Sequence, residues 1–384
     1  MTAMQIPSTS AQPGMEEPYP QAEGELRRGS LSGKNLLRIS VIVPVRNGSL
    51  HLPRCLEALG RSGYPEFEVI VVDDCSTDNT SQVAALYGAR CLRTPQTQGP
   101  AAARNLGARH AKGEILLFVD ADVVLPPDTL TMIADDFAVD SGLAAVFGSY
   151  DDKPPWKSFI SQYKNLMHHY VHQTSNETAT TFWAGCGAMR SSIFEVFGGF
   201  DAETYSTPSV EDIALGLKLN QRGYRIRLDK RIEVKHLKRW TLRNLLRADI
   251  LHRAVPWTKL ILSTRQLPQD LNLNYASRVS SLLVAVLLVG LLVLPFSLGG
   301  YIRVRPLILL PLLAAIAVAL LYLNLGVYRF FLRKRGWWFA ARCVLAHWIY
   351  YLYSGVTFVL CLVLHVLHLL PSPVRDVSVR DSQK

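Results

Sequence analysis

The chain has 384 residues, of which 49% are hydrophobic, so it is long enough for one large domain or two. Its six cysteines show neither metal-type spacing nor a paired pattern, which argues against a zinc module or a disulfide scaffold and indicates reduced thiols. The net charge of +10 indicates an anionic partner, and eleven Lys and Arg against three acids in residues 222–253, just before the first long apolar run, favour membrane lipids over nucleic acid.

The first segment, residues 1–34, is rich in Pro, Ser, Gln, Glu and Gly and has no apolar stretch. It therefore lacks the apolar centre of a secretory signal peptide. Such a composition cannot bury enough surface to offset the entropy of ordering. We expect a disordered tail.

Residues 35–239 alternate between short apolar runs and segments with helical spacing. This alternation predicts an α/β domain with a mostly parallel, Rossmann-like sheet. The expected strands are residues 39–43, 69–72, 89–92 and 115–119, and the expected helices are residues 50–59, 78–87 and 100–110.

Polar residues follow three of these strands, at the point where each strand ends. In open α/β sheets ligands bind outside the carboxyl ends of the strands, so these residues are expected to share one site. Candidates for contact with a nucleotide there are Pro44 and Arg46 after the first strand, and Asp73 or Asp74 after the second. A carboxylate at that position can accept hydrogen bonds from a base or a ribose, although part of this stretch also serves as a helix cap.

Asp120 and Asp122 follow the strand at residues 115–119. Two carboxylates one residue apart repel each other unless a positive charge lies between them. A divalent cation that carries a diphosphate supplies this charge, because hard cations bind carboxylate and phosphate oxygens. The pair therefore predicts a metal and nucleotide site, and the alternative is a chance pair in a turn, where Asp is common.

Arg104 lies in the Ala-rich helix just before this strand. It is a candidate to hold the base or the phosphates, and the alternative is a charge solvated at the helix surface. Glu211 and Asp212 open a later helix, where the helix dipole favours carboxylates whatever their role. We interpret Asp212 as a general base that removes a proton from an acceptor hydroxyl, and Glu211 as an acceptor contact.

His236, Arg239 and Trp240 follow at the end of the predicted domain. His236 is a candidate third metal ligand or diphosphate contact. Arg239 and Trp240 are candidate acceptor contacts, with the indole as a platform for a sugar or a lipid. The alternative for Trp240 is an anchor at the membrane interface, a depth that indoles favour.

Residues 240–275 interleave Leu and Ile with Arg, which predicts an amphipathic segment on the bilayer surface; the alternative is an ordinary helix packed on the domain. Residues 276–372 are expected to form a membrane region, followed by a tail at 373–384. At about 1.5 Å per residue, 20 or more apolar residues cross the roughly 30 Å hydrocarbon core. The expected spans are residues 279–301, 306–327 and 343–370.

The orientation follows from the connections between these spans. The second connection carries Arg329, Arg333, Lys334, Arg335 and Arg342, whereas the first has only two Arg. Basic connections stay in the cytoplasm, so the chain is predicted to be a multi-pass protein of the cell membrane with a cytoplasmic catalytic domain.

The ordered set of motifs over roughly residues 37–240 resembles the bacterial, membrane-anchored members of the family 2 glycosyltransferases, which have the GT-A fold. The resemblance implies an inverting transfer of a sugar from a nucleotide diphosphate, with Mg²⁺ or Mn²⁺. It implies that Asp74 contacts the nucleoside, that Asp120 and Asp122 hold the nucleotide and metal, and that Asp212 is the base. The motifs are VIVPVRN at 41–47, VVDDCSTD at 71–78, ARN at 103–105, VDAD at 119–122, GGFD at 198–201 and ED at 211–212.

Processive members of that family carry Gln-x-x-Arg-Trp where this chain has HLKRW at 236–240. The Gln is missing here, and three spans are few for a channel that conducts a polymer. Both observations argue against polymer synthesis. We therefore expect transfer of a single sugar to a hydroxyl or phosphate of a lipid-linked or other acceptor. The alternatives are a processive polysaccharide synthase and a non-catalytic membrane scaffold that binds nucleotide sugars.

Overall fold

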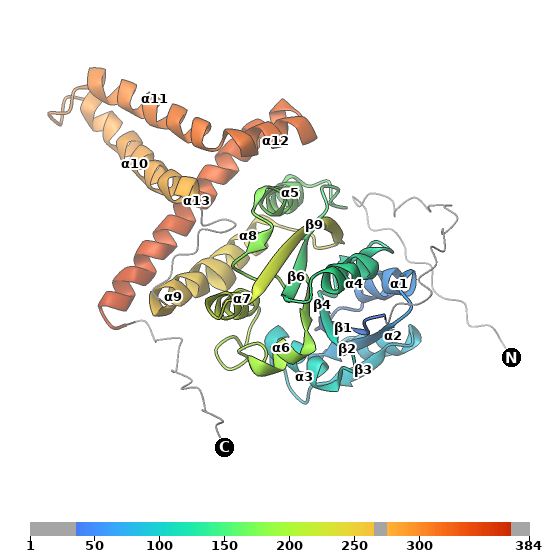
Figure 1. Cartoon of the computed structure of the whole chain (residues 1–384). Coiled ribbons are helices and arrows are strands. Elements are labelled where there is room, and N and C mark those ends of the chain that lie inside the picture. The colour runs from blue at the N-terminus through green and yellow to red at the C-terminus, as the bar shows by residue number, and fades with distance from the viewer. Residues whose placement is uncertain (1–35, 265–274, 370–384) are drawn as a thin grey trace.

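The computed structural model describes residues 36–264 and 275–369. An α/β domain comes first, and four helices at the end of the chain form an arm beside it (Figure 1). The expected disordered tail (1–34), the expected C-terminal tail (373–384) and residues 265–274 of the expected interfacial segment (240–275) lie outside the described residues.

The domain is built on a nine-stranded sheet with the order β3-β2-β1-β4-β8-β6-β9-β5 and with β7 beside β9. β1 to β4 pair in parallel, and β8 is antiparallel to both β4 and β6. β9 is parallel to β6, so both run in the direction of β1–β4, and the predicted mostly parallel sheet is confirmed. The strands are β1 (Ile39–Val45), β2 (Phe67–Asp73), β3 (Arg90–Arg93), β4 (Ile115–Val119), β5 (Val123–Val124), β6 (Leu143–Tyr150), β7 (Thr178–Ala179), β8 (Cys186–Arg190) and β9 (Arg225–His236).

Helices cover both faces of this sheet, which explains why the central strands read as continuous apolar runs. Val41 and Val43 of β1 enter a core under α1 and α4, whereas Ile42 enters a second core under α3, α6 and α7. Alternate residues of a strand point to opposite faces, so one strand supplies both cores. The helices are α1 (Leu52–Gly60), α2 (Thr80–Leu86), α3 (Pro100–His110), α4 (Thr129–Val139), α5 (Phe159–Thr174), α6 (Ser191–Val196) and α7 (Glu211–Gln221).

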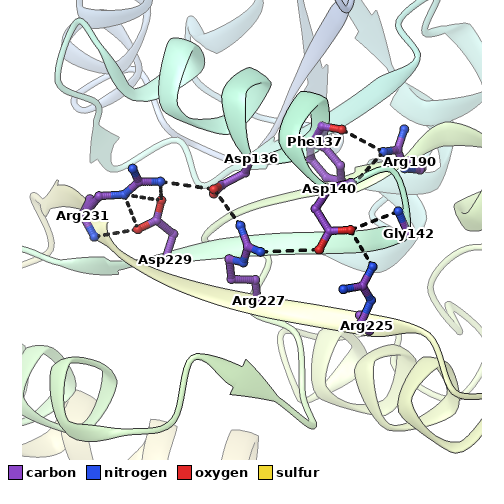
Figure 2. Close-up of polar contacts among 9 residues, drawn as sticks. All are labelled: Asp136, Phe137, Asp140, Gly142, Arg190, Arg225, Arg227, Asp229 and Arg231. Carbon is purple, nitrogen blue, oxygen red and sulfur yellow. Dashed lines mark hydrogen bonds and ion pairs between the residues drawn. The ribbon is translucent and has the colours of Figure 1, made fainter.

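An ion-pair cluster fastens α4 to β9 (Figure 2). Asp136 Oδ1 on α4 forms ion pairs with the guanidinium groups of Arg227, at 3.0 Å, and Arg231, at 3.2 Å. Arg231 also donates hydrogen bonds to Asp229, which lies in the same irregular stretch of β9. Burial, reinforced by the neighbouring Asp229, raises the pKa of Asp136 to about 6. Because the cluster extends to Arg225 at the start of β9, it stabilises the half of the sheet away from the strand ends that carry the polar motifs.

The arm follows two shorter helices and a π-helical turn. Three of its helices, α10, α11 and α13, are long and apolar enough to cross a membrane, which confirms the three predicted runs with shifted bounds. The third begins at Trp337 and not at residue 343, because Gly336, with φ of 82°, ends α12 and allows the next helix to start. The elements are α8 (Leu242–Asp249), the π-helix (Ile250–Ala254), α9 (Val255–Thr264), α10 (Tyr275–Leu298), α11 (Pro306–Leu323), α12 (Leu325–Arg335) and α13 (Trp337–Val366).

Polar and aromatic contacts join this arm to the domain. Asp249 of α8 accepts a hydrogen bond from Lys164 of α5 at 2.6 Å and another from the hydroxyl of Tyr353 of α13 at 2.7 Å. Phe330 and Phe331 of α12 pack on α5 in a shared apolar cluster. The basic connection expected between the second and third spans is therefore mostly helix α12, held against the domain.

Candidate functional site

A buried guanidinium organises the end of β4. Arg104 of α3, only 5% exposed, donates to Asp120 Oδ1 at 2.8 Å and to Glu211 Oε1 at 2.7 Å. It thus joins α3, β4 and the start of α7. Arg104 therefore has a bridging role in the protein, and Glu211, 4% exposed, is bound to it; a contact of Arg104 with the base or phosphates and of Glu211 with an acceptor stay predictions.

Asp122 lies beside His236, with 3.4 Å between the Asp122 Oδ2 and His236 Nε2 atoms. The contact arises because β5 pairs with the end of β9, which sets Val123 opposite His236. Burial alone would raise the pKa of Asp122, but the charge and hydrogen bond of His236 outweigh it and hold this pKa at about 2. His236 is also stacked on Tyr150, with ring centroids 4.3 Å apart, so its orientation is fixed on both sides.

The carboxylates at the end of β4 suit a divalent cation that is also bound by phosphate and water oxygens. Within residues 36–264 and 275–369, no three His, Cys, Asp or Glu side chains gather as a metal site, and His236 Nε2 faces Asp122. The side chains of Asp120 and Asp122 are 35% and 26% exposed, so each can present a carboxylate oxygen to a ligand. Mg²⁺ typically takes one or two carboxylates and completes its shell with phosphate oxygens and water.

Asp73, the last residue of β2, and Asp74 are both buried, but they bind different segments. Asp73 is fully buried and accepts hydrogen bonds from Ser76 N at 2.8 Å and from the Ser81 hydroxyl, so it stabilises the turn into α2. Asp73 therefore has a structural role in this turn, and its contact with a nucleotide stays a prediction. Asp74, 4% exposed, accepts from Gln98 N at 2.8 Å and Gly99 N at 2.9 Å, which ties β2 to the start of α3.

The turn after β1 packs against the same region. Pro44 is buried within β1, whereas Arg46 is exposed beyond it. Asn47 has φ of 51° and accepts a hydrogen bond from Thr77 N at 2.8 Å. The turns after β1 and β2 are therefore joined, and of the two expected contacts only Arg46 has a side chain open to a ligand.

Gly99 is a close approach that admits no side chain. Its φ is 86°, and a Cβ atom would lie 2.2 Å from the carbonyl oxygen of Ser206. We expect Gly99→Ala to destabilise the domain by roughly 1–3 kcal/mol and to displace the amide that binds Asp74, because both the backbone and the contact are strained. Urea denaturation measures this, with Gly88→Ala as the control: its φ is 69° but the space around it is open. Equal losses for both variants would contradict a role for the Ser206 contact.

Asp212 lies at the start of α7 and is half-buried. Its Oδ2 accepts a hydrogen bond from Ala184 N at 2.9 Å, and Oδ1 accepts one from Ile213 N at 2.8 Å. Burial, with the charge of Glu211 added to it, raises the pKa of Asp212 to about 7. A carboxylate with this pKa can accept a proton near neutral pH.

The segment before β8 connects Asp120 with Asp212. The sequence did not identify it as part of the site. Ala184 N bonds Asp212, while the carbonyl oxygen of Gly185 accepts from Asp120 N at 3.1 Å. A Cβ on Gly185 would lie 2.4 Å from the Trp183 ring, so the segment is tightly packed. Its small residues, WAGCGA at 183–188, are the signal that could have indicated a close approach.

The expected acceptor platform is differently placed. Trp240 is 6% exposed, its amide donates to Ser161 Oγ at 2.9 Å, and Lys238 Nζ lies 4.4 Å from the ring centroid. It therefore packs against α5 and is not an open surface for a sugar. Arg239 is exposed and lies over the Trp156 ring, 5.2 Å from its centroid.

The chain is similar to known glycosyltransferases. Residues 40–198 match the family model described as Glycosyl transferase family 2. Over 102 residues the chain is 39% identical to the poly(ribitol-phosphate) beta-N-acetylglucosaminyltransferase TarS of Staphylococcus aureus, a match that covers 25% of this chain and 18% of TarS. Over 223 residues it is 29% identical to the pre-mycofactocin glycosyltransferase of Mycobacterium tuberculosis, covering 56% of this chain and 45% of that protein. The chain thus spans less than half the length of these relatives.

A solved structure shows the same fold over most of the chain. The mannosyltransferase PcManGT from Pyrobaculum calidifontis, solved in complex with GDP-Man and Mn²⁺, aligns with a TM-score of 0.52 and 19% identity. The alignment covers 87% of this chain and 88% of that chain. The predicted GT-A fold is therefore confirmed.

Proposed function

Because residues 40–198 match the model of glycosyltransferase family 2, we propose that the chain transfers a sugar from a nucleotide-diphosphate sugar to a lipid-linked acceptor at the membrane surface. One observation carries the proposal: Asp120 and Asp212 are hydrogen-bonded to two consecutive residues, Gly185 and Ala184, in the segment before β8, although these aspartates are far apart along the chain. The relatives' names and the GDP-Man and Mn²⁺ bound to PcManGT support the donor class.

In this proposal the donor lies along the ends of β1, β2 and β4. Asp74, with Arg46 nearby, binds the nucleoside side, and Asp120 with Asp122 would hold a divalent cation together with the diphosphate. Such a cation neutralises charge that develops on a leaving diphosphate. Arg104 keeps Asp120 oriented through their 2.8 Å contact.

Asp212 acts on the acceptor in the same scheme. Its carboxylate takes the proton from the acceptor hydroxyl as that oxygen bonds to the anomeric carbon, and the bond from this carbon to the diphosphate breaks. Attack from the opposite face inverts the configuration. The contacts to Ala184 N and Ile213 N fix the carboxylate, so the proton acceptor is positioned before the acceptor binds.

The three candidate membrane spans support a lipid-linked acceptor. We infer that α10, α11 and α13 cross the membrane, that the catalytic domain faces the cytoplasm, and that α8 and α9 lie at the interface. Lys164 and Arg253 both lie near Asp249 at the junction with α13, so the domain and the arm are held in one arrangement. A lipid-borne hydroxyl or phosphate can then reach the edge of the sheet without leaving the bilayer.

The test uses the purified full chain in nanodiscs with a panel of nucleotide sugars and a membrane lipid extract. We expect release of nucleoside diphosphate from one donor class, loss of this release with EDTA, and recovery with Mg²⁺ or Mn²⁺, because phosphate and carboxylate oxygens need the shared cation. A gel of the product then separates single transfer from polymer synthesis. Donor binding without any release would instead support a non-catalytic scaffold.

A further inference from the structure

A pocket of about 290 Å³ lies where the α/β domain meets the arm. The start of α5 and the residues before it form one wall, and the end of α12 with the start of α13 forms the other. The lining comprises three cations, one amide and two phenyl rings, with no carboxylate among these described residues: Lys157, Phe159, Gln162, Arg335, Phe339 and Arg342. The pocket is therefore positively charged.

The positive charge is not neutralised by the surrounding protein. Arg335 donates to neutral acceptors, Gln162 Oε1 at 2.8 Å and the carbonyl oxygen of Asp152 at 3.0 Å. The Asp152 carboxylate pairs with Lys334 and not with the pocket. In the described part of the chain, none of the three lining cations forms an ion pair with an acid. An anion that enters the pocket would therefore meet groups without a competing carboxylate.

The pocket also has an aromatic side. Phe159 and Phe339 meet edge to face with ring centroids 5.2 Å apart, and Arg342 lies over Phe159 with its guanidinium carbon 4.0 Å from the centroid. This stacking leaves the edge of the guanidinium available for hydrogen bonds, in the planar geometry that matches a phosphate. Phosphate-binding groups thus adjoin an apolar surface.

Because α13 is a candidate membrane span, a pocket beside its first turns is expected at the depth of lipid headgroups. Trp337 and Trp338, 72% and 62% exposed, occupy the first turn of this candidate span. Indoles favour the membrane–water interface, and Arg342 follows within the next turn. Basic pockets beside membrane helices bind the phosphates of lipid headgroups.

We propose that this pocket binds the headgroup phosphate of an anionic membrane lipid, which fastens the arm to the catalytic domain. The phosphate lies between Lys157, Arg335 and Arg342, and the start of the lipid's apolar part lies on Phe159 and Phe339. The inference depends on the candidate spans and not on the transferase activity proposed above. A failed donor assay therefore leaves it untouched.

The experiment compares the full chain in nanodiscs of phosphatidylcholine alone and of phosphatidylcholine mixed with phosphatidylglycerol. The pocket variant is Lys157→Gln with Arg342→Gln; Arg335 stays, because its hydrogen bonds support the fold. The control is Arg329→Gln with Arg333→Gln, which removes the same charge from exposed positions of α12. Native mass spectrometry counts retained phosphatidylglycerol, and thermal unfolding reports its effect on stability.

We expect the wild type and the control to retain phosphatidylglycerol and to melt at a higher temperature when it is present. The pocket variant should lose the retained lipid and need a roughly ten-fold higher lipid fraction for half of the stabilisation. Equal losses in both variants would mean general attraction to a charged surface, and an unaffected pocket variant would place the lipid elsewhere. Either result overturns the proposal.

Inorganic phosphate distinguishes a lipid from a free anion. In nanodiscs of phosphatidylcholine alone, added phosphate should not reproduce the stabilisation, because it makes no contact with Phe159 and Phe339. If millimolar phosphate stabilises the wild type as phosphatidylglycerol does, and the pocket variant does not respond, the pocket is a site for a free anion and the lipid proposal is wrong.

Discussion

Replacing Asp212 by Asn is expected to lower turnover by roughly 10²–10⁴-fold, because a positioned general base contributes about that much to a proton transfer. The amide has nearly the same shape and retains an oxygen for the hydrogen bond from Ala184 N, but it cannot take a proton. Donor affinity should change little, since Asp212 has no contact with Asp120 or Asp122. Nucleoside diphosphate release at saturating donor and cation measures turnover, and isothermal titration measures donor affinity.

The pH dependence adds a second readout for the same residue. The pKa of Asp212 is raised to about 7, so the base is protonated and inactive below this pH and becomes competent as pH rises through it. For the wild type, kcat/KM should fall about ten-fold per pH unit below pH 7, since this quantity reports groups of the free enzyme. In Asp212→Asn this fall of kcat/KM below pH 7 should disappear from the residual activity.

Asp201→Asn is the matched control, because Asp201 lies in the segment before α7 and its Oδ1 accepts a hydrogen bond from the amide of Thr204 at 3.0 Å. It should keep turnover within a few-fold of the wild type. If Asp212→Asn keeps near-normal turnover, or loses turnover together with donor affinity, Asp212 is not the base.

Local patterns were sufficient to predict the architecture and to group polar side chains at one edge of the sheet. The strand ends carry the polar motifs, and parallel pairing brings these ends to one edge, so Asp74, Asp120 and Asp122 could be grouped before any coordinates. The reversed β8 was harder to predict, because Cys186–Arg190 is short and its neighbours are small residues. Yet this strand brings Ala184 to Asp212 and Gly185 to Asp120.

The hydrogen-bond partners of individual residues were harder to predict where they come from distant segments of the chain. Arg104 pairs with Glu211 across 107 positions, and no periodicity within α3 or α7 encodes that partner. The burial of Trp240 depends on α5, whose Ser161 binds its backbone. Asp73 and Asp74 are identical in type, and only the path of the chain after β2 decides which one is buried completely. Residue type and strand position thus predict a site, whereas partner identity requires the packed structure.

Removal of the Arg104 guanidinium is the most damaging change expected for the fold of the site. Arg104→Met leaves Glu211 buried with an unpaired charge and releases Asp120, and breaking such a buried pair costs about 3–5 kcal/mol. For a domain of this size that lowers the melting temperature by roughly 6–20 °C. Circular dichroism melts of the full chain measure the change, and Arg109→Met, on the exposed side of the same helix, is the control.

A second substitution separates charge from packing. If the cost comes from the stranded carboxylate, adding Glu211→Gln to Arg104→Met should recover a large part of the lost stability, because a buried amide costs far less than a buried charge. Turnover should stay low in the double variant, since Asp120 still lacks the Arg104 guanidinium that orients its carboxylate. Equal stability of the single and double variants would show instead that Arg104 acts by filling space beside Phe200, whose ring centroid lies 5.6 Å from the guanidinium carbon.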